Sequence, residues 1–362
     1  MNIVPASNAE GRGSVPAEIE TFRIAILSTP RTGNTWLRRL LDAIYSLPQV
    51  VADTPNDVDW DQLPQQCILQ LHWPVDTALE SLLSKHEFKV VTLFRNPFDT
   101  LISILHFATV WKNTGLWMGG LQGDETEIIG TRPCSREFAK YAESDRAKLL
   151  IATSANWAES ENCLPIRYEL LVEDTLGELK RVTDRLLAAP DEVISAAVEA
   201  NSLTRLRACV QNQHFWRGQP GIWRTLLPHA VAQDIERHHA PAFAAMGYTS
   251  DADQNLTHAD ADANWATLEL ATIRQEMAES RRQLKQTSNE LIEARWEITA
   301  LEGRIEPLVK VGPLVLKIAE RVNGTVEFYQ GAVASIRRHL RMPQKCIGPA
   351  KRIPQEATDG SG

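Results

Sequence analysis

Apolar residues gather in four short runs along the first half of the chain, and each run is followed by a more polar stretch. The runs are FRIAILST (22–29), QCILQLH (66–72), KVVTLFR (89–95) and CLPIRYE (163–169). Apolar positions at helical spacing follow the first and third runs, in RRLLDAIYSL and TLISILHFATVWK. Strands that alternate with helices predict βαβ units and a mainly parallel sheet. We therefore expect a three-layer α/β domain with a central parallel sheet over residues 21–249.

Between residues 110 and 135 the pattern loses its period. This stretch, WKNTGLWMGGLQGDETEIIGTRP, contains five glycines, three tryptophan or methionine side chains and several acidic residues. Glycine-rich segments without a period are typical of loops. We expect a mobile loop over a cleft, in which Trp111, Trp117 and Asp124 are candidates for contact with a substrate.

A heptad pattern occupies residues 265–308. Apolar residues recur at intervals of seven without a break: Leu270, Met277, Leu284, Leu291, Ile298 and Ile305. The positions three residues later form a weaker second row: Ile273, Ser280, Thr287, Ala294, Leu301 and Leu308. As a helix this stretch would be roughly 65 Å long, and such a pattern predicts a coiled coil with a second chain. A long amphipathic helix that folds back on its own domain remains the alternative.

The remaining segments are polar or basic. We expect a disordered tail, a linker, an amphipathic helical segment and a second disordered tail at residues 1–20, 250–264, 309–342 and 343–362. Residues 309–352 hold nine Lys or Arg against two Asp or Glu, a local charge of +7. A basic amphipathic segment fits peripheral contact with anionic lipid, and it fits equally a cationic helix end in solvent.

Composition narrows the class of protein. The 362 residues carry a net charge of −8, and five cysteines are scattered without a CxxC pair. We therefore expect reduced thiols, no metal site and no nucleic-acid partner. The polar N-terminus lacks the apolar core of a signal peptide, so we expect a cytoplasmic protein, with the basic segment as its one candidate for membrane contact.

The turn after the first strand carries the first candidate chemistry. The strand is followed by Pro30-Arg31-Thr32-Gly33-Asn34-Thr35-Trp36 and then a helix. A helix N-terminus offers free N–H groups to an anion, and Gly33 allows close approach of the backbone. An NTPase loop would end in Gly-Lys-Ser/Thr and would need an Asp for magnesium on a later strand. Here Asn34 follows Gly33 and the later strand ends in Arg95, so the pattern predicts a phosphate held by cations without a metal.

Two motifs together identify a family. LFRNPFDTLIS places Arg95 and Ser103 at the start of a second helix, about 60 residues after the first turn. The pair resembles the 5′-phosphosulfate loop (Pro-Lys/Arg-Ser-Gly-Thr-Thr-Trp) and the 3′-phosphate element (Arg-Asn-Pro-x-Asp-x-x-x-Ser) of sulfotransferases that use 3′-phosphoadenosine-5′-phosphosulfate (PAPS). Further likeness lies in LQLHWP (69–74), RYELLVED (167–174) and WRGQPGIWR (216–224). The resemblance implies a P-loop-like domain over residues 22–248, followed by the long coiled-coil helix on which it is silent.

The resemblance also implies roles for individual residues. His72 would be the general base and Arg31 the cation that stabilises the leaving phosphate. The nucleotide would be bound by residues of both motifs and of the later segments: Arg31, Thr32, Gly33, Asn34, Thr35, Trp36, Arg95, Ser103, Tyr168, Trp216, Arg217 and Gly218. For Trp36 a place in the core is the alternative to stacking on adenine, and for Tyr168 a packing role is equally open. Trp223 and Arg224 would position the late loop, and Arg224 is a further candidate for phosphate contact.

Three positions depart from the family pattern. Arg31 replaces the usual lysine and cannot readily give up its proton, so its role would be electrostatic. Gln70 replaces a basic residue two positions before the histidine. Arg217 stands where relatives carry two adjacent basic residues, which weakens the grip on the 3′-phosphate.

The expected function is transfer of a sulfuryl group from PAPS to a hydroxyl or amine, with no metal. The acceptor is expected to be a glycan, a glycolipid or a small natural product, because aromatic side chains beside polar groups suit a sugar. With His72 as the base, activity should fall below about pH 6.5. Two alternatives remain: a P-loop phosphotransferase or NTPase, and a non-catalytic coiled-coil scaffold with a degenerate nucleotide site.

Overall fold

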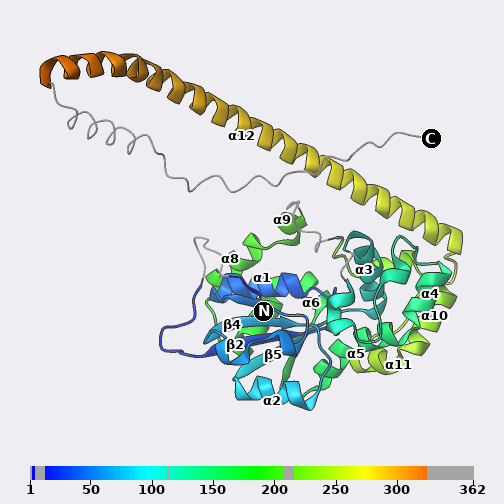
Figure 1. Cartoon of the computed structure of the whole chain (residues 1–362). Helices are drawn as coiled ribbons and strands as arrows, with labels where there is room; N and C mark the ends of the chain where they lie inside the picture. The colour runs from blue at the N-terminus through cyan, green and yellow to red at the C-terminus, as the bar shows by residue number, and fades with distance from the viewer. Residues whose placement is uncertain (1, 5–12, 112–113, 208–215, 324–362) are drawn as a thin grey trace. The chain divides into compact units, whose positions relative to one another are not determined.

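The computed structural model of the chain describes residues 2–4, 13–111, 114–207 and 216–323 (Figure 1). Within these residues six strands form one sheet in the order β1-β3-β4-β2-β5-β6. All neighbouring strands run parallel except β1 and β3, which are antiparallel. The strands are β1 (Asn2–Val4), β2 (Phe22–Leu27), β3 (Gln49–Val51), β4 (Gln66–Leu71), β5 (Phe88–Phe94) and β6 (Cys163–Arg167).

Helices connect and cover these strands. The α-helices are α1 (Asn34–Tyr45), α2 (Thr77–Lys85), α3 (Pro97–Val110), α4 (Arg136–Ala142), α5 (Asp145–Glu159), α6 (Tyr168–Glu173), α7 (Thr175–Leu186), α8 (Asp191–Ala200), α9 (Leu203–Arg207), α10 (His229–His238), α11 (Ala240–Met246) and α12 (His258–Asn323). Short 3₁₀ helices lie at Pro55–Asp57, Trp60–Gln62, Thr114–Gly120, Thr126–Ile128 and Ile222–Thr225.

The central strand β2 is buried along its whole length because both faces of the sheet are covered. Ile24 and Ile26 point to one face, in an apolar cluster with residues of α1, α7 and α8. Ala25 and Leu27 point to the other face, in a cluster with Leu79 of α2 and residues of α5. This alternation along one strand gives three layers. The predicted three-layer α/β domain with a central parallel sheet is therefore confirmed.

A further apolar cluster lies beside the sheet and is built mainly of helices. It joins residues of α3, α4, α5, α10 and α11 with two tryptophans, Trp223 and Trp265. Trp265 belongs to α12 and is 2% exposed. The first turns of α12 are thus part of the core of this domain.

The topology brings three strand ends to one place. β2 lies between β4 and β5, with Leu27 paired to Leu71 and Ile26 paired to Val91. The chain leaves β2 towards β3 and β4 on one side and reaches β5 on the other, which opens a crevice at the carboxyl edge of the sheet. The turn after β2, His72 after β4 and Arg95 after β5 all start from this edge.

The chain divides into two compact units, residues 1–281 and 282–362. Helix α12 begins at His258, so the predicted linker at 250–264 is wrong in its second half. The reason is a cap: the Thr257 hydroxyl accepts from the N–H of Asp260 and donates to its carboxylate. The backbone then stays helical past Pro307, where the predicted heptads end.

The structure also differs from the predicted N-terminal tail. Residues 2–4 pair with β3, and Val15 is buried against residues of α1 and α8. The tail at 343–362 and residues 324–342 of the predicted amphipathic segment lie outside the described residues. Within the described part, no helix combines the length and the apolar character that crossing a bilayer requires.

Candidate active site

The turn between β2 and α1 has the backbone shape of an anion cradle. Arg31 and Gly33 both lie in the left-handed region, with φ of 70° and 108°. Helix α1 begins directly after Gly33 without a side-chain cap, so its first N–H groups stay available to a ligand. A Cβ on Gly33 would lie 2.8 Å from two ring carbons of Tyr168. Glycine is therefore required there both by the backbone angle and by the packed tyrosine.

Buried hydroxyls hold this turn in place. The Thr29 N–H donates to Ser154 Oγ at 2.7 Å, and the Ser154 hydroxyl donates to the Leu93 carbonyl at 3.0 Å. The Leu93 N–H donates in turn to Ser28 Oγ at 2.8 Å. Ser154 on α5 thus ties the turn to β5. Because all these groups are buried and partnered, the turn is rigid before any ligand arrives.

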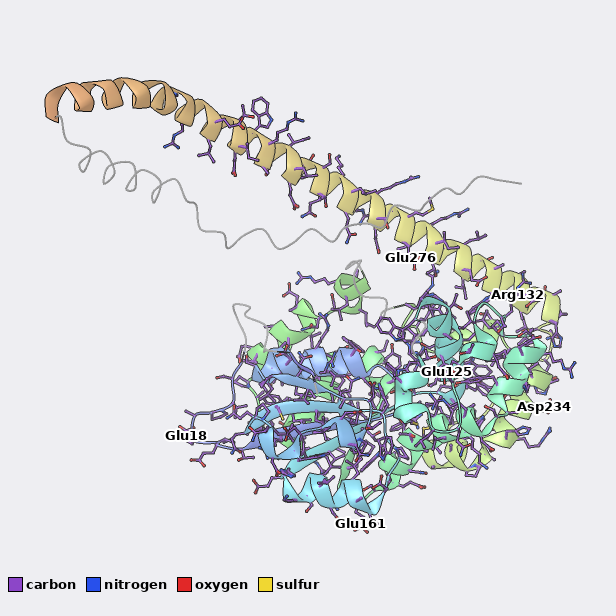
Figure 2. The ribbon with its side chains drawn as sticks, viewed as in Figure 1. Glu18, Glu125, Arg132, Glu161, Asp234 and Glu276 are labelled. Carbon is purple, nitrogen blue, oxygen red and sulfur yellow. The ribbon has the colours of Figure 1, made fainter. Side chains whose placement is uncertain are left out.

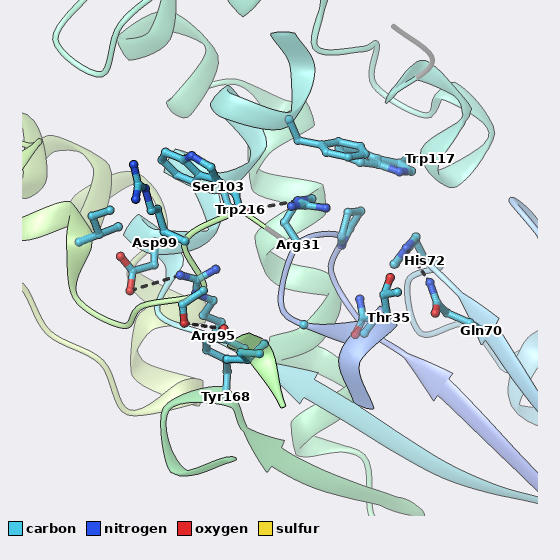
Figure 3. Close-up of a pocket in the computed structure, with 18 residues that line it drawn as sticks. Arg31, Thr35, Gln70, His72, Arg95, Asp99, Ser103, Trp117, Tyr168 and Trp216 are labelled. Carbon is cyan, nitrogen blue, oxygen red and sulfur yellow. Dashed lines mark hydrogen bonds and ion pairs between the residues drawn. The ribbon is translucent and has the colours of Figure 1, made fainter. Parts of the chain in front are cut away.

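Three arginines line the same pocket as the turn: Arg31, Arg95 and Arg217. Figure 3 shows the first two of them among the lining residues. Arg31 Nε donates to Ser103 Oγ at 3.3 Å, and the guanidinium lies 4.1 Å from the centroid of the Phe107 ring. Burial, and next the nearby charge of Arg95, lower the pKa of Arg31 to about 9. Arg31 is therefore still a cation at neutral pH, and the pocket attracts anions.

In Arg95 and Arg217 the Nε donor is buried and has no hydrogen-bond partner among the described residues. Arg95 is only 6% exposed, and its guanidinium is stacked 4.7 Å from the centre of the Tyr168 ring. A buried donor without a partner is costly, so these two Nε atoms are suited to hydrogen bonds with an anionic ligand.

Asp99 joins the second motif to the late loop. Its carboxylate accepts from the N–H groups of Gly221 at 2.6 Å and Trp223 at 3.1 Å, and lies 3.9 Å from Arg95. Asp99 is fully buried. One carboxylate therefore fixes both the arginine after β5 and the loop that returns some 120 residues later.

The Tyr-Glu pair after β6 completes this part of the site. The Tyr168 hydroxyl donates to the Gly218 carbonyl at 2.7 Å. Glu169 accepts from the Asn96 N–H at 2.9 Å and from the Tyr248 hydroxyl at 2.5 Å. Tyr168 thus lines the pocket and supports the late loop, which joins the two roles left open for it by the sequence.

His72 lies at the other end of the pocket. Its Nδ1 is 2.8 Å from the Ser28 carbonyl, which can only accept, so Nδ1 carries the proton and Nε2 has the free lone pair. Gln70 Nε2 is 3.4 Å from His72 Nε2. Burial lowers the pKa of His72 to about 4; the bond to Ser28 opposes this, and the charges of Arg38 and Arg31 add to it. The imidazole is therefore neutral at pH 7 and able to accept a proton.

Aromatic side chains lie next to His72. Trp117 and Phe107 are stacked with centroids 5.6 Å apart, and both line the pocket. The Trp117 carbonyl accepts from Arg146, which is buried and paired with Glu125 at 2.9 Å. Arg146 also donates to the carbonyls of Thr114 and Leu121. The loop predicted to be mobile is thus fastened, from Thr114 onward, by a buried ion pair.

Most of the predicted site residues meet in this one pocket. Its lining includes Arg31, Gly33, Asn34, Thr35, His72, Arg95, Ser103, Tyr168, Trp216, Arg217 and Gly218. Thr32 and Trp36 do not line it. The Thr32 hydroxyl donates to the Thr29 carbonyl within the turn, and Trp36 Nε1 donates to the Asn201 carbonyl in the core. The core position, the alternative weighed for Trp36, is the one observed.

Two late residues are also placed. Trp223 is fully buried against Phe98, with ring centroids 4.3 Å apart, so it positions the loop from below. Arg224 forms an exposed pair with Asp251 at 2.7 Å and does not line the pocket. The proposed phosphate contact of Arg224 is therefore not seen, because Asp251 holds its guanidinium.

Sequence reasoning missed the residues that support the site. The Asp99 position was visible in the motif, but its bond to a loop far along the chain was not. Phe107 was visible only as one apolar residue of a helix. Ser154 and Arg146 carry no local signal at all, since their roles depend on which strands and loops lie beside α5.

The chain is similar to known sulfotransferases. A protein-family model described as "Sulfotransferase domain" matches residues 22–247. Sulfotransferase 6B1 from Mus musculus is 22% identical over 251 residues, 63% of this chain and 78% of that protein. Cytosolic sulfotransferase 12 from Arabidopsis thaliana is 23% identical over 274 residues, 64% of this chain and 80% of that protein. The solved structure of mouse sulfotransferase SULT7A1 complexed with PAP is 15% identical, with a TM-score of 0.47 over 63% of this chain and 89% of that one.

Proposed function

The chain belongs to the sulfotransferase family, and we propose that this member takes its sulfuryl group from PAPS and transfers it to a hydroxyl or amine of an acceptor. The observation that carries the proposal is the pair of buried Nε atoms of Arg95 and Arg217, which have no partner within the described part of the chain and belong to the same pocket as the left-handed turn. Together with Arg31 they give three cations from three separate elements. That charge suits a nucleotide with a phosphate on both ends of its ribose.

The roles proposed from sequence fit the positions of the side chains. Arg31 and the first N–H groups of α1 would hold the 5′-phosphosulfate. Arg95, Ser103, Arg217 and Gly218 would surround the 3′-phosphate. Tyr168 would orient Arg95 by stacking, rather than contact the nucleotide through its hydroxyl, because that hydroxyl is bonded to Gly218.

In the proposed reaction the acceptor oxygen or nitrogen attacks sulfur as the bond from sulfur to the phosphate oxygen breaks. His72 Nε2 accepts the proton of the acceptor, and the Ser28 carbonyl stabilises the imidazolium that forms. Arg31 stabilises the negative charge that grows on the leaving phosphate. The products are the sulfated acceptor, 3′,5′-phosphoadenosine and a proton.

For the acceptor we keep the class expected from sequence: a glycan, a glycolipid or a small natural product. Support comes from the two stacked rings of Phe107 and Trp117 near His72, since flat apolar faces beside polar atoms suit both sugar rings and aromatic compounds. Arg146 keeps Trp117 in position for such stacking.

We further propose that the heptad residues of α12 join two copies of the chain. In the single chain these side chains lie in water: Leu284 is 72% exposed, Leu291 66% and Ile298 56%. An apolar row of this length is stable when it is covered by a like row. Cytoplasmic location and membrane contact by the basic segment stay predictions, the latter resting mainly on residues outside the described ranges.

The test of the nucleotide is thermal melting with 3′,5′-phosphoadenosine against ATP with magnesium. A ligand at 100 times its Kd raises the stability by about 2.7 kcal/mol, a visible shift in Tm. We expect the shift with the bisphosphate alone. A shift with ATP alone would overturn the proposal in favour of a phosphotransferase, and binding of the bisphosphate without turnover of any acceptor would favour a scaffold.

A further inference from the structure

The first turns of α12 touch the nucleotide pocket through the late loop. This part of the helix belongs to the same compact unit as the sheet, residues 1–281. It is fastened there by buried Trp265 and by an ion pair of Asp262 with Arg132 at 3.6 Å. Figure 2 shows Arg132 beside the start of the helix. The family match ends at residue 247, before this helix begins.

A chain of hydrogen bonds runs between the helix and two pocket residues. Trp216 Nε1 donates to Thr272 Oγ1 at 3.0 Å, and the Thr272 hydroxyl donates to the Leu268 carbonyl at 2.9 Å. The same carbonyl accepts from Arg217 Nη2 at 3.2 Å. This series of hydrogen bonds therefore begins at Trp216 and ends at Arg217, the next residue in the sequence, and it passes through the hydroxyl of Thr272.

The rings around Trp216 fix it further. His106 of α3 is stacked on the indole, with centroids 4.1 Å apart and planes 15° apart, and Trp265 meets it edge-on at 5.9 Å. His106 lies three residues after Ser103, so it is on the same side of α3 as that pocket residue. Trp216 is thus held between α3 and α12, and it carries Arg217 with it.

These contacts restrict the orientation of the Arg217 guanidinium. Its Nη2 donates to the helix, its Nε is buried without a partner among the described residues, and Arg217 lines the pocket. Because the guanidinium is planar and rigid, holding one nitrogen restricts the direction in which the whole group points. We propose that α12, through Thr272 and the Leu268 carbonyl, positions Arg217 for the 3′-phosphate of the nucleotide. The inference rests on the proposed function, because it assumes that this phosphate is the ligand.

The test is the affinity of full-length variants for 3′,5′-phosphoadenosine and for adenosine 5′-monophosphate, measured by titration calorimetry. Thr272→Val keeps the shape of the side chain and removes both hydrogen bonds. We expect about two- to tenfold weaker binding of the bisphosphate, the range for one hydrogen bond, and unchanged binding of the monophosphate, which lacks the 3′-phosphate. Thr272→Ser should restore the affinity.

The matched control is Thr267→Val on the same helix. The Thr267 hydroxyl makes the same kind of bond, to the Ala263 carbonyl at 2.9 Å, but it is exposed. It should bind both nucleotides as the parent does. Trp216→Phe should weaken bisphosphate binding, and adding Thr272→Val to it should cause no further loss.

The outcomes separate the two proposals. Equal loss for both nucleotides, or no loss in Thr272→Val, would overturn the positioning role while leaving the nucleotide assignment intact. If the parent chain does not bind the bisphosphate, the proposed function fails and this inference fails with it. Melting of each ligand-free variant reveals whether a loss of binding is only a loss of folding.

Discussion

The carbonyl of Ser28 determines which ring nitrogen of His72 carries the proton. Because the Ser28 oxygen accepts from Nδ1, the other ring nitrogen keeps its lone pair on the pocket side. The Gln70 amide lies 3.4 Å from this nitrogen and can donate to its lone pair. If His72 is the general base, as proposed, the acceptor hydroxyl or amine would take the place of this weak contact. Gln70 would then lie beside the proton that is transferred.

His72→Ala should lower kcat by about 10²–10⁴, the range for loss of a general base. The acidic limb of kcat/KM for PAPS should lie near pH 4 rather than near pH 6.5, because burial lowers the pKa of His72 to about 4 and only the neutral ring accepts a proton. Initial rates from pH 3.5 to 8 measure both. The control is His238→Ala, an exposed histidine on α10. A limb at pH 6.5 that persists in His72→Ala would rule this histidine out as the base.

The same pKa shift acts on stability. A histidine that is neutral in the fold and protonated when unfolded stabilises the fold above its unfolded pKa of about 6.5. That stabilisation is lost as the pH falls from about 6.5 towards 4, where the unfolded chain binds a proton that the folded chain does not.

Gly33→Ala should lower both stability and nucleotide affinity. The added methyl group would lie 2.8 Å from the Tyr168 ring, at φ 108°. Gly123→Ala is the matched control, since Gly123 has φ 104° and open space around its missing Cβ. Both variants carry backbone strain of about 1–3 kcal/mol, so the excess loss in Gly33→Ala measures the contact with Tyr168. Urea denaturation measures the free energy of unfolding. Equal losses of stability in the two variants would show that the Tyr168 ring does not exclude a Cβ at position 33.

Among the elements, the stretch from Thr114 to Ile128 is the clearest case of order that the sequence hides. Its glycines and lack of period predict a mobile loop, yet Arg146 binds three of its carbonyls and Glu125 neutralises the arginine. Figure 2 shows Glu125 within the domain. The loop is fixed by a side chain from another element, which no local pattern records.

Glu125→Gln should destabilise the fold by about 3–5 kcal/mol, because it leaves the Arg146 charge buried without a counter-charge. Glu127→Gln is the control. Glu127 lies two residues after Glu125 and pairs with Lys140. Both of these side chains are more than half exposed, so the loss of stability should stay under about 1 kcal/mol. At temperatures where Glu125→Gln is folded, the KM for the acceptor should rise because Trp117 is no longer held in place. The Kd for 3′,5′-phosphoadenosine should stay unchanged because the pocket arginines do not move. Equal stability of the two variants would contradict this.

The strands and the two motif helices were predictable because each is encoded locally. FRIAIL is apolar except for Arg23, and a central parallel strand is expected to be mostly apolar because both of its faces are covered. Pro97 after Asn96 marks a helix start, and the Asn96 side chain does cap it by accepting from the Phe98 N–H. The late loop was recognisable as a motif. The bonds of Asp99 to Gly221 and Trp223 join residues more than 120 positions apart, and the spacing of residues within a motif does not indicate such distant contacts.

At the scale of the whole molecule, the heptads make a prediction independent of the pocket. Leu284→Asp with Leu291→Asp puts two charges into the proposed seam, so we expect a monomer in multi-angle light scattering, where the parent chain is a dimer or larger. Both residues lie in the second unit, 282–362, so nucleotide binding should persist.

The control for the seam is Gln286→Asp with Asn289→Asp, which adds the same charge on other faces of the helix. It should leave the oligomer intact. A parent chain that is already monomeric would reject the coiled coil, and loss of nucleotide binding in a folded Leu284/Leu291 variant would reject the independence of the two units.

The boundary of the domain was the main error at this scale. Residues 250–264 are polar and rich in Asp and Ala, a composition typical of linkers, but alanine and a Thr-x-x-Asp cap also start helices well. What decides between them is Trp265, which is buried in the same apolar cluster as Trp223. The heptad period correctly indicated a helix, and the part of that helix up to Arg281 belongs to the same compact unit as the sheet.

The hydrogen bonds that Asp99 accepts from Gly221 and Trp223 have a consequence for the enthalpy of nucleotide binding. They hold the described part of the late loop, from Trp216 onward, against the second motif through contacts within the protein itself. A loop that is already ordered loses little conformational entropy when its ligand arrives. We therefore expect nucleotide binding to be driven by enthalpy, with a small change in heat capacity, unlike the large one that accompanies coupled folding. Asp99→Asn would loosen the loop, and its signature would be an entropic penalty of binding that the parent protein lacks.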